Sequence, residues 1–194
     1  MSDLTKFDSF FRLPSHLHNA AQAVNAMSGP YADIKTSSFD WVGFKDAVDT
    51  YAKKGRGNLT YDKINSTVIQ QSDAAVSAMV DAIVKFLSVA FGASVDPLAL
   101  AEKVKAAFTI PLSEEKVFLY RKQTGKNVQW EYRVVFAVPI SGVQEYFYSL
   151  VTTIKIEAEN TELKNFLYEN NVKKFSAEIK AMQLVVKDSF KGDN

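Results

Sequence analysis

The sequence predicts an α/β protein in which helices flank a sheet of long, largely antiparallel strands. Residues 15–92 place apolar side chains at helical spacing with one irregular interruption, and the spacing changes to two from Val117 onward. Two of the strands that follow are much longer than the average strand of about 5–6 residues. A chain of 194 residues fits one domain around one core, and we take residues 1–194 as that domain.

Two helices are expected near the N-terminus. The first begins where Ser15 can cap it and ends at Gly29-Pro30. The second begins near Asp40 and ends before Gly55, a residue suited to the left-handed conformation just past a helix. One side of the second helix carries four large apolar residues, Trp41, Phe44, Val48 and Tyr51. The next stretch, Arg56 to Gln71, fits neither period, so we expect a loop there with at most a short strand.

A third helix is predicted from Asp73 to Phe91. Its polar residues fall at three- and four-residue spacing and form one narrow stripe, which consists of Asp73, Ser77, Asp81, Lys85 and Ser88. Because the rest of its circumference is apolar, most of this helix must be covered by other parts of the protein. A fourth helix follows, opened by Pro97 and closed by Pro111, so that the helices form two hairpins.

Strands are predicted at Val117–Gln123, Val128–Val138 and Glu145–Ala158. Alternation divides the second strand into two faces. One carries Val128, Trp130, Tyr132, Val134, Phe136 and Val138, and the other carries Gln129, Glu131, Arg133, Val135 and Ala137. The third strand is divided in the same way, with Tyr146, Tyr148, Leu150, Thr152, Ile154 and Ile156 opposite Phe147, Ser149, Val151, Thr153, Lys155 and Glu157. The segment Phe175–Val186 fits either a helix or a strand, and Glu157–Lys174 is rich in charge and typical of a solvated loop or short surface helix.

Composition and motifs argue against several functions. With 23 basic and 22 acidic residues, the net charge of +1 is too small for broad nucleic-acid binding. The chain has no cysteine, and its two histidines, His16 and His18, cannot face the same way on one helix, so we expect no metal site. Nucleophile elbows, phosphate loops and other catalytic motifs do not occur, so we expect neither an enzyme nor a bound cofactor.

The N-terminus lacks the basic start and continuous apolar stretch of a secretory signal. Nowhere do about 18 apolar residues follow one another, so we expect a soluble protein that meets a membrane by refolding. Its two long strands, at roughly 3.3 Å per residue, exceed the ~9–11 residues with which a tilted strand crosses a bilayer. One face of each strand suits lipid and the other suits water in a pore, although covered sheets in ordinary α/β proteins look similar.

The residues of the long strands also carry a resemblance to a known family. The runs Trp130-Glu131-Tyr132-Arg133-Val134-Val135-Phe136 and Tyr146-Phe147-Tyr148-Ser149-Leu150-Val151 closely resemble the paired strands of the volvatoxin-like haemolysins, which are pore-forming mushroom proteins. More distantly, the arrangement is similar to the Cyt-type cytolytic δ-endotoxins of insecticidal bacteria. The resemblance extends upstream to Phe39-Asp40-Trp41 and downstream to Leu184-Val185-Val186-Lys187.

This resemblance implies a three-layer Cyt-like fold and a toxin that binds membrane lipids, moves a helical cover aside and inserts strands as a homo-oligomer. It favours a strand for Phe175–Val186. The implied inserting residues are Val128, Trp130, Tyr132, Val134, Phe136, Val138, Tyr146, Tyr148, Leu150, Ile154, Ile156, Ile179, Leu184 and Val186. The implied lumen residues are Gln129, Glu131, Arg133, Ser149, Thr153 and Lys155. The implied cover consists of Trp41, Phe44, Val48, Tyr51, Met79, Ile83, Phe86 and Leu87.

The resemblance further implies a monomer or dimer in solution that is released without a classical signal peptide and acts on the membrane of a target cell. Two other functions remain open. One is a lipid- or glycan-binding defence protein that coats membranes without perforating them. The other is a detergent-like disruptor that forms no defined pore.

Overall fold

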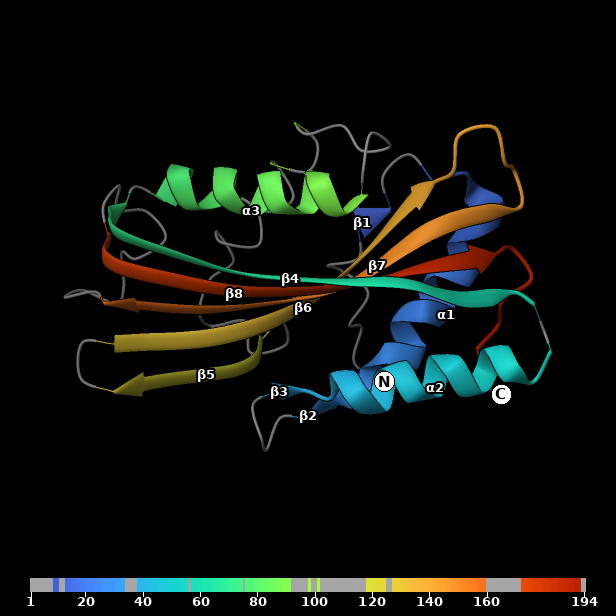
Figure 1. The fold of residues 1–194 in the computed structure, drawn as a ribbon, viewed down its shortest axis with the longest axis horizontal. Coiled ribbons are helices and arrows are strands. Elements are labelled where there is room, and N and C mark those ends of the chain that lie inside the picture. Colours follow the sequence, from blue (N-terminus) through green and yellow to red (C-terminus); the bar gives the residue numbers. More distant parts are fainter. Residues whose placement is uncertain are drawn as a thin grey trace.

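The structure is a computed structural model that describes residues 9–10, 13–33, 38–55, 57–74, 76–91, 98, 101, 118–124, 127–159 and 172–192. Four long strands pair antiparallel in the order β6 (Asn127–Pro139), β7 (Tyr146–Glu159), β8 (Val172–Lys187) and β4 (Leu59–Ala74). They contain 13, 14, 16 and 16 residues and run nearly the whole length of the molecule in Figure 1. The predicted α/β fold with a largely antiparallel sheet of long strands is confirmed.

Two short strands pair with β6 on the side away from β7. Strand β5 (Phe118–Thr124) is antiparallel to the first part of β6, and β1 (Ser9–Phe10) is parallel to Phe136 and Ala137. A separate two-stranded sheet is formed by β2 (Ala32–Asp33) and β3 (Ser38–Phe39). Strand β4 is therefore the outermost strand at one edge of the main sheet, and β1 and β5 lie at the other.

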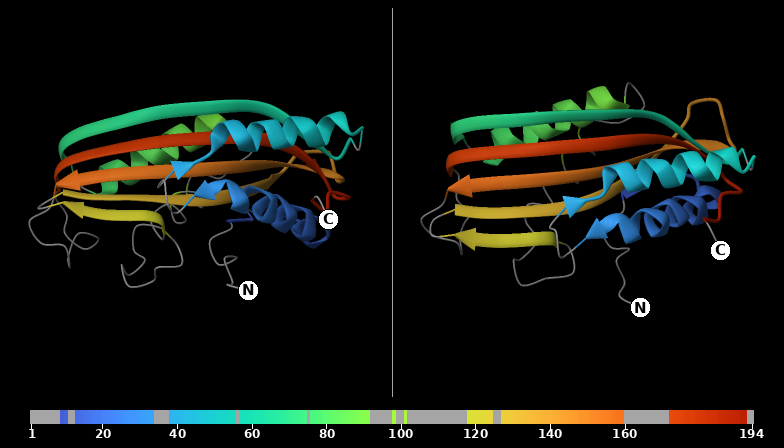
Figure 2. Two further views of the ribbon diagram at one scale, coloured as in Figure 1. Left: turned by 90° about the horizontal axis from the view of Figure 1, so that it is seen from below. Right: turned by 60° about the horizontal axis from the view of Figure 1, so that its bottom comes forward.

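Helices cover both faces of the sheet. Helix α1 (His18–Ser28), flanked by short 3-10 turns at Ser15–Leu17 and Gly29–Tyr31, lies with α2 (Trp41–Lys53) against one face. Helix α3 (Val76–Phe91) lies against the other face, as the views of Figure 2 show. We call the face under α1 and α2 face A and the face under α3 face B. The two groups of helices are staggered, so that α1 and α2 cover one end of the sheet and α3 extends over the other end (Figure 1).

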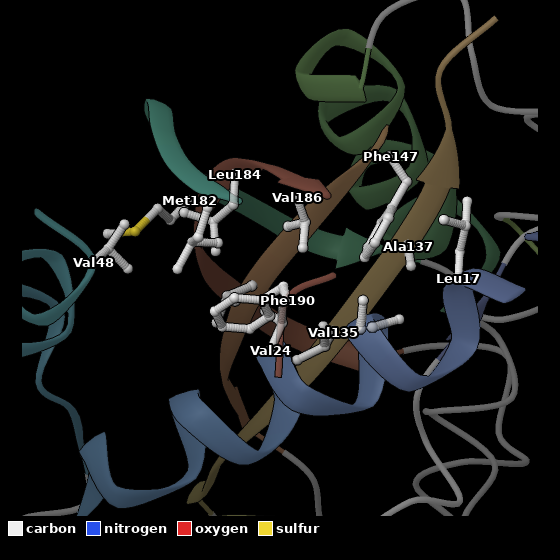
Figure 3. Close-up of a cluster of buried hydrophobic side chains, with 14 of the residues drawn as sticks. Leu17, Val24, Val48, Val135, Ala137, Phe147, Met182, Leu184, Val186 and Phe190 are labelled. Atoms are coloured by element: carbon white, nitrogen blue, oxygen red, sulfur yellow. The ribbon is translucent and has the colours of Figure 1, made fainter. Parts of the chain in front are cut away.

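The main core lies between face A and the helices α1 and α2. In Figure 3 Leu17 and Val24 point from the N-terminal helical segment toward Val135, Phe147 and other side chains of the sheet. The buried members of this core are Leu13, Leu17, Ala20, Ala21, Val24, Phe39, Phe44, Val48, Tyr51, Leu59, Val135, Ala137, Phe147, Val151, Met182, Leu184, Val186 and Phe190. Burial of this apolar area holds α1 and α2 on the sheet.

The predicted ends of α2 are confirmed. The Asp40 carboxylate accepts a hydrogen bond from the backbone N–H of Gly43 at 2.9 Å, which satisfies one of the free donors at the helix start. At the other end Gly55 has a φ of 71°, the left-handed conformation that glycine adopts without a steric cost.

The prediction of a loop at Arg56–Gln71 is wrong, because Leu59–Ala74 forms β4. A bulge between Tyr61 and Lys63 shifts the strand by one residue. Leu59 and Tyr61 therefore share face A with Ile64, although an unbroken alternation would place Ile64 on face B. The bulge and the many polar residues hide the two-residue period in the sequence.

The predicted third helix begins later than expected. Asp73 and Ala74 end β4, and α3 starts at Val76. The exposed stripe of α3 retains Ser77, Asp81 and Lys85, but it continues at Val89, which is 75% exposed, whereas the hydroxyl of Ser88 is buried. The apolar remainder of α3 is covered as predicted, with Val80, Ile83, Val84, Leu87 and Ala90 buried.

The C-terminal segment that periodicity left undecided is a strand, as the resemblance implied, and it forms β8. Of the predicted fourth helix, Leu98 and Ala101 are described and both are helical, and its other residues lie outside the described part of the chain. The charge-rich stretch Glu157–Lys174 begins in β7 and ends in β8, and residues 160–171 between them are likewise outside it.

The hydrogen bond that caps α2 gives a test of this local structure. Asp40→Ala is expected to lower the free energy of unfolding by about 1 kcal/mol, because a donor at the helix start loses its partner. Asp40→Asn should retain most of the stability. Urea denaturation measures both, and Asp46→Ala on the exposed side of α2 is the control, with a change within about 0.5 kcal/mol. A loss of equal size in Asp46→Ala would contradict the capping role.

Candidate functional site: the two faces of the long-strand sheet

The register of the strands assigns each residue to one of the two faces. In antiparallel strands residues directly opposite each other share a face, and successive residues alternate. Val135 pairs with Val151, and Val151 pairs with Met182, all three in the core under α1 and α2. The same rows continue along face A toward the far end of the sheet.

At this far end face A becomes polar. Three consecutive rows cross β6, β7 and β8, and each is read from the printed register. The rows are Arg133–Thr153–Lys180, Glu131–Lys155–Glu178 and Gln129–Glu157–Ser176. We call these nine residues the polar end of face A. Three of them are basic and three are acidic, so opposite charges alternate across the strands and stabilise the pairing.

Face B is mainly apolar on β6, β7 and β8 where its side chains are described. Phe136 pairs with Leu150, and Ile154 pairs with Ile179. The buried apolar residues of this face are Val134, Phe136, Val138, Leu150, Ile154, Ala177, Ile179 and Ala181. Among the buried polar groups of face B, Thr152 Oγ1 and Gln183 Oε1 make no hydrogen bond within the described part of the chain, and the same holds for Ser88 Oγ on α3.

The polar end of face A surrounds a cavity of about 220 Å³ next to the start of α2. Ser38, Phe39 and Trp41 line it on the helix side, and Glu131, Thr153, Lys155, Glu178 and Lys180 line it on the sheet side. The ammonium of Lys180 lies 3.0 Å from a carboxylate oxygen of Glu178, and that of Lys155 lies 3.8 Å from Glu157. Charge is therefore balanced around a space that protein side chains leave open.

Glu131 is the most buried charged residue of this cavity, with 6% of its surface exposed. Burial raises the pKa of its carboxyl above the ordinary value, and the negative charge of Glu178 acts in the same direction. The ammonium groups of Lys155 and Lys180 oppose this increase without cancelling it. The carboxylate of Glu131 thus destabilises the folded state in its charged form.

Arg133 connects the polar end of face A to the cover. Its guanidinium donates to the backbone carbonyl of Asn25 at 3.1 Å and to the hydroxyl of Ser28. Both acceptors lie in the last turn of α1, where the helix dipole favours a cation. This contact holds the C-terminal end of α1 beside the polar rows. The apolar residues of α1 pack in the core.

The structure places the predicted site residues as follows. The predicted lumen residues Gln129, Glu131, Arg133, Ser149, Thr153 and Lys155 all lie on face A, where Ser149 is fully buried. Of the predicted inserting residues, Val134, Phe136, Val138, Tyr146, Tyr148, Leu150, Ile154 and Ile179 lie on face B. Val128, Trp130, Tyr132 and Ile156 are at face B positions by register, and their side chains are outside the described part of the chain.

Leu184 and Val186 differ from the rest of the predicted inserting set. They pair with Ser149 and Phe147 on face A and belong to the core under α1 and α2. Local sequence places them with the face B residues only because it contains no register for the C-terminal segment. The twelve other members keep one common face.

The predicted cover residues lie on the two helical layers. On α2, Phe44, Val48 and Tyr51 are buried against face A, and Trp41 is half-buried beside the cavity. On α3, Ile83 and Leu87 are buried and Phe86 is half-buried. The side chain of Met79 lies outside the described part of the chain.

Sequence reasoning missed two parts of this site. The first is β4, the fourth long strand, which allowance for one bulge after Tyr61 would have revealed. The second is the contact of Arg133 with α1, for which the sequence holds no signal, because residues 25 and 133 are joined only by the tertiary fold.

Comparisons with known proteins agree with this architecture. Residues 14–190 match the family model described as Bacillus thuringiensis toxin. The fold is similar to a solved δ-endotoxin, with a TM-score of 0.78 and 15% identity over 96% of this chain and 82% of that chain. It is also similar to the activated Cyt2Ba monomer from Bacillus thuringiensis subsp. israelensis, with a TM-score of 0.73 and 14% identity over 94% of this chain and 98% of that chain. No curated protein sequence matches significantly.

The chain therefore belongs to the Bacillus thuringiensis toxin family, and its fold is that of the Cyt-type δ-endotoxins. Proteins of this family are cytolytic toxins. At 14–15% identity the structural similarities establish the fold alone. The narrower resemblance to the volvatoxin-like haemolysins stays a prediction. Within the described residues no helix has both the length and the apolarity needed to cross a membrane.

The raised pKa of Glu131 predicts a pH-dependent effect on stability. Glu131→Gln is expected to raise the free energy of unfolding at neutral pH, because it removes a buried carboxylate. The pKa of Glu131 is higher in the folded state than in the unfolded state. The charged carboxylate therefore destabilises the folded state fully above the folded pKa, and this destabilisation disappears as the pH falls below the unfolded pKa. The advantage of the variant should therefore shrink on acidification.

Urea midpoints measured from neutral pH to about pH 4 test this expectation. Glu145→Gln is the matched control, because Glu145 is exposed and pairs with Lys187 at the surface, where such a pair contributes little. A difference between the wild type and Glu131→Gln that stays constant across the pH range would contradict the assignment.

Proposed function

We propose that the protein is a pore-forming cytolytic toxin that binds lipid membranes, displaces helices from its sheet and inserts the long strands as a homo-oligomer. The family supplies the cytolytic activity. The observation that carries the pore mechanism is the division of the long strands β6, β7 and β8 into a mainly apolar face B and a face A with a polar end.

Strand length supports insertion. The shortest of the four strands, β6, has 13 residues, which corresponds to roughly 43 Å at about 3.3 Å per residue. A tilted strand needs about 9–11 residues to cross the hydrocarbon core of a bilayer. Each strand can therefore span the membrane without extension, and backbone hydrogen bonds between the strands remain in place, as a membrane requires.

The chemistry of the faces supports an orientation. Face B would meet the lipid chains, since its described residues are mainly aliphatic and aromatic. The polar end of face A would meet water in the lumen, where the alternating charges of Glu131, Lys155 and Glu178 are solvated. In the isolated chain α3 shields face B, and lipid would replace that helix.

The cover is suited to removal. Helix α3 is bound through apolar side chains, and lipid chains can replace such contacts without loss. Ser88, Thr152 and Gln183 each bury an oxygen atom without a hydrogen bond to the described protein, and a buried polar group without a partner costs on the order of 1–3 kcal/mol. The packing between α3 and face B is therefore weaker than that of an entirely apolar interface.

The partners in this proposal are membrane lipids of a target cell, and the protein acts after release to the extracellular space. Dye release from protein-free liposomes is the direct test. We expect leakage at micromolar protein, with a size limit for the released dyes and with oligomers that resist detergent. No leakage from neutral or anionic vesicles would refute the proposal.

The same experiment separates the two other functions. A lipid- or glycan-binding defence protein would sediment with liposomes or bind a glycan without releasing dye. A detergent-like disruptor would release large and small dyes alike and would leave no detergent-resistant oligomer.

The two tryptophans report insertion without added labels. Trp130 is at a face B position of β6, and Trp41 belongs to α2 in the cover. In Trp41→Phe, lipids brominated on their acyl chains should quench the fluorescence of Trp130 and its emission should shift to the blue on vesicle binding. In Trp130→Phe, the remaining Trp41 should be quenched much less. Equal quenching of the two tryptophans would contradict the separation of strands and cover.

A further inference from the structure

The two edges of the main sheet differ. At one edge, β5 pairs with residues 127–132 of β6, and β1 pairs with Phe136 and Ala137. At the other edge, no strand in the described part of the chain pairs with the outer side of β4. Figure 2 shows β4 as the outermost strand in both views. One edge is therefore capped by short strands, and the other offers a strand of 16 residues for pairing.

The open edge lacks the features that usually prevent strand addition. Proteins protect edge strands with charges, proline or bulges. In β4 these features lie toward its two ends, with Asp62 and Lys63 beside the bulge and Asp73 next to the last residue. The run Ile64–Ser72 has no charged residue, glycine or proline. Its Ile64 and Val68 are 40% and 59% exposed on face A.

We infer that the outer edge of β4 is the surface on which a second copy of this chain assembles, and that it accepts the part of the β6 edge of that copy that β5 covers, residues 127–132, after β5 has separated from it. This inference rests on the proposed membrane assembly. It goes beyond that proposal by naming the two edges that meet and the segment that keeps them apart.

Strand direction selects β6 as the partner. Four consecutive antiparallel strands alternate in direction, so β4 runs opposite to β6. Copies arranged head to tail therefore bring β4 antiparallel to β6, and every junction repeats the pairing found inside the chain. With β5 in place the same junction would be parallel, because β5 is itself antiparallel to β6.

Side-chain chemistry supports the same partner. The rows of face A that contain Glu131 and Arg133 end at Val68 and Ser66 on β4. The junction would continue these rows without placing two like charges opposite each other. A head-to-tail contact is also the kind that closes into a ring, whereas a β4–β4 contact would stop at a dimer.

β5 has a specific role in this arrangement. It contains seven residues and its register with β6 is interrupted between Phe118 and Tyr120, so it is a short, irregular cap on a longer strand. While it remains paired, the isolated chain presents one free edge and one blocked edge. Assembly then waits for the release of β5.

A disulfide that fixes β5 to β6 tests this role, and the absence of cysteine in the chain makes the design clean. Lys122 and Gln129 are direct partners in the register, a geometry that suits a cross-strand disulfide. The double variant Lys122→Cys/Gln129→Cys, when oxidised, should bind vesicles but form no oligomer detectable by amine cross-linking. Reduction should restore the oligomers. The matched control joins the direct partners Glu157 and Ser176 of β7 and β8, which stay paired in any assembly, and should behave alike in both redox states.

A second pair of variants tests the open edge. Val68→Lys adds a charge to the uncharged run Ile64–Ser72 and should reduce the amount of cross-linked oligomer on vesicles by about tenfold. Binding to vesicles, measured by flotation, should stay unchanged. Val42→Lys on α2 is the control, because Val42 is 73% exposed and lies on a helix rather than on an edge strand.

Oligomers of the wild-type size in the oxidised Lys122–Gln129 variant, or in Val68→Lys, would overturn the inference. So would an assembly that ends at dimers and is insensitive to the β5 disulfide, since it would indicate β4–β4 pairing. These readouts are independent of dye release. Oligomers that are lost in the oxidised β5–β6 disulfide variant and in Val68→Lys, but that release no dye, would refute the pore and support the edge pairing. Dye release that neither variant reduces would support the pore and refute the edge pairing.

Discussion

The register of the four long strands is the constraint on which the rest of the structure depends. Side chains alternate along a strand, so a slip by one residue would move every side chain of that strand to the opposite face. In the observed register Val135, Val151 and Met182 meet under α1 and α2, while Phe136, Leu150 and Ile154 lie on the other face. The apolar covering of each face fixes this register, and the register in turn gathers the charged residues at one end of face A.

The bulge in β4 serves the same constraint. Leu59 and Tyr61 belong to the end of face A that α2 covers, and Ile64, Ser66 and Val68 belong to the other end. These two groups have opposite parity in the sequence, and only an extra residue between them allows one strand to follow face A from end to end. Without the bulge Lys63 would replace Ile64 on face A, next to Met182.

Local patterns in the sequence were sufficient where each element depends on its own residues. Residues close in sequence determine the cap at Asp40, the left-handed conformation of Gly55 and the alternation of β6 and β7. The sequence therefore predicted α2, β6 and β7 correctly. β4 was missed because its bulge interrupts the period, and β8 could not be assigned from periodicity because its spacing suits a helix as well. The partition of Leu184 and Val186 from the face B residues needed the pairing of β8 with β7, which local sequence does not contain.

The arrangement of cover and charge explains how one sheet can suit two environments. Helices α1 and α2 bind the apolar end of face A through a core of large side chains, whereas the polar end is held to α1 by the Arg133 guanidinium. Such a charged contact stabilises the C-terminal end of α1 where the helix dipole is negative, yet water can solvate the guanidinium equally well once the helix departs. Separation of α1 from the polar end therefore costs little at Arg133, and the main resistance comes from the apolar core around Phe44 and Phe147. The membrane interface supplies an alternative apolar surface for helices released from that core, shallower than the hydrocarbon depth of the strands, so lipid contact acts on the strongest part of the cover rather than on the polar residues beneath it.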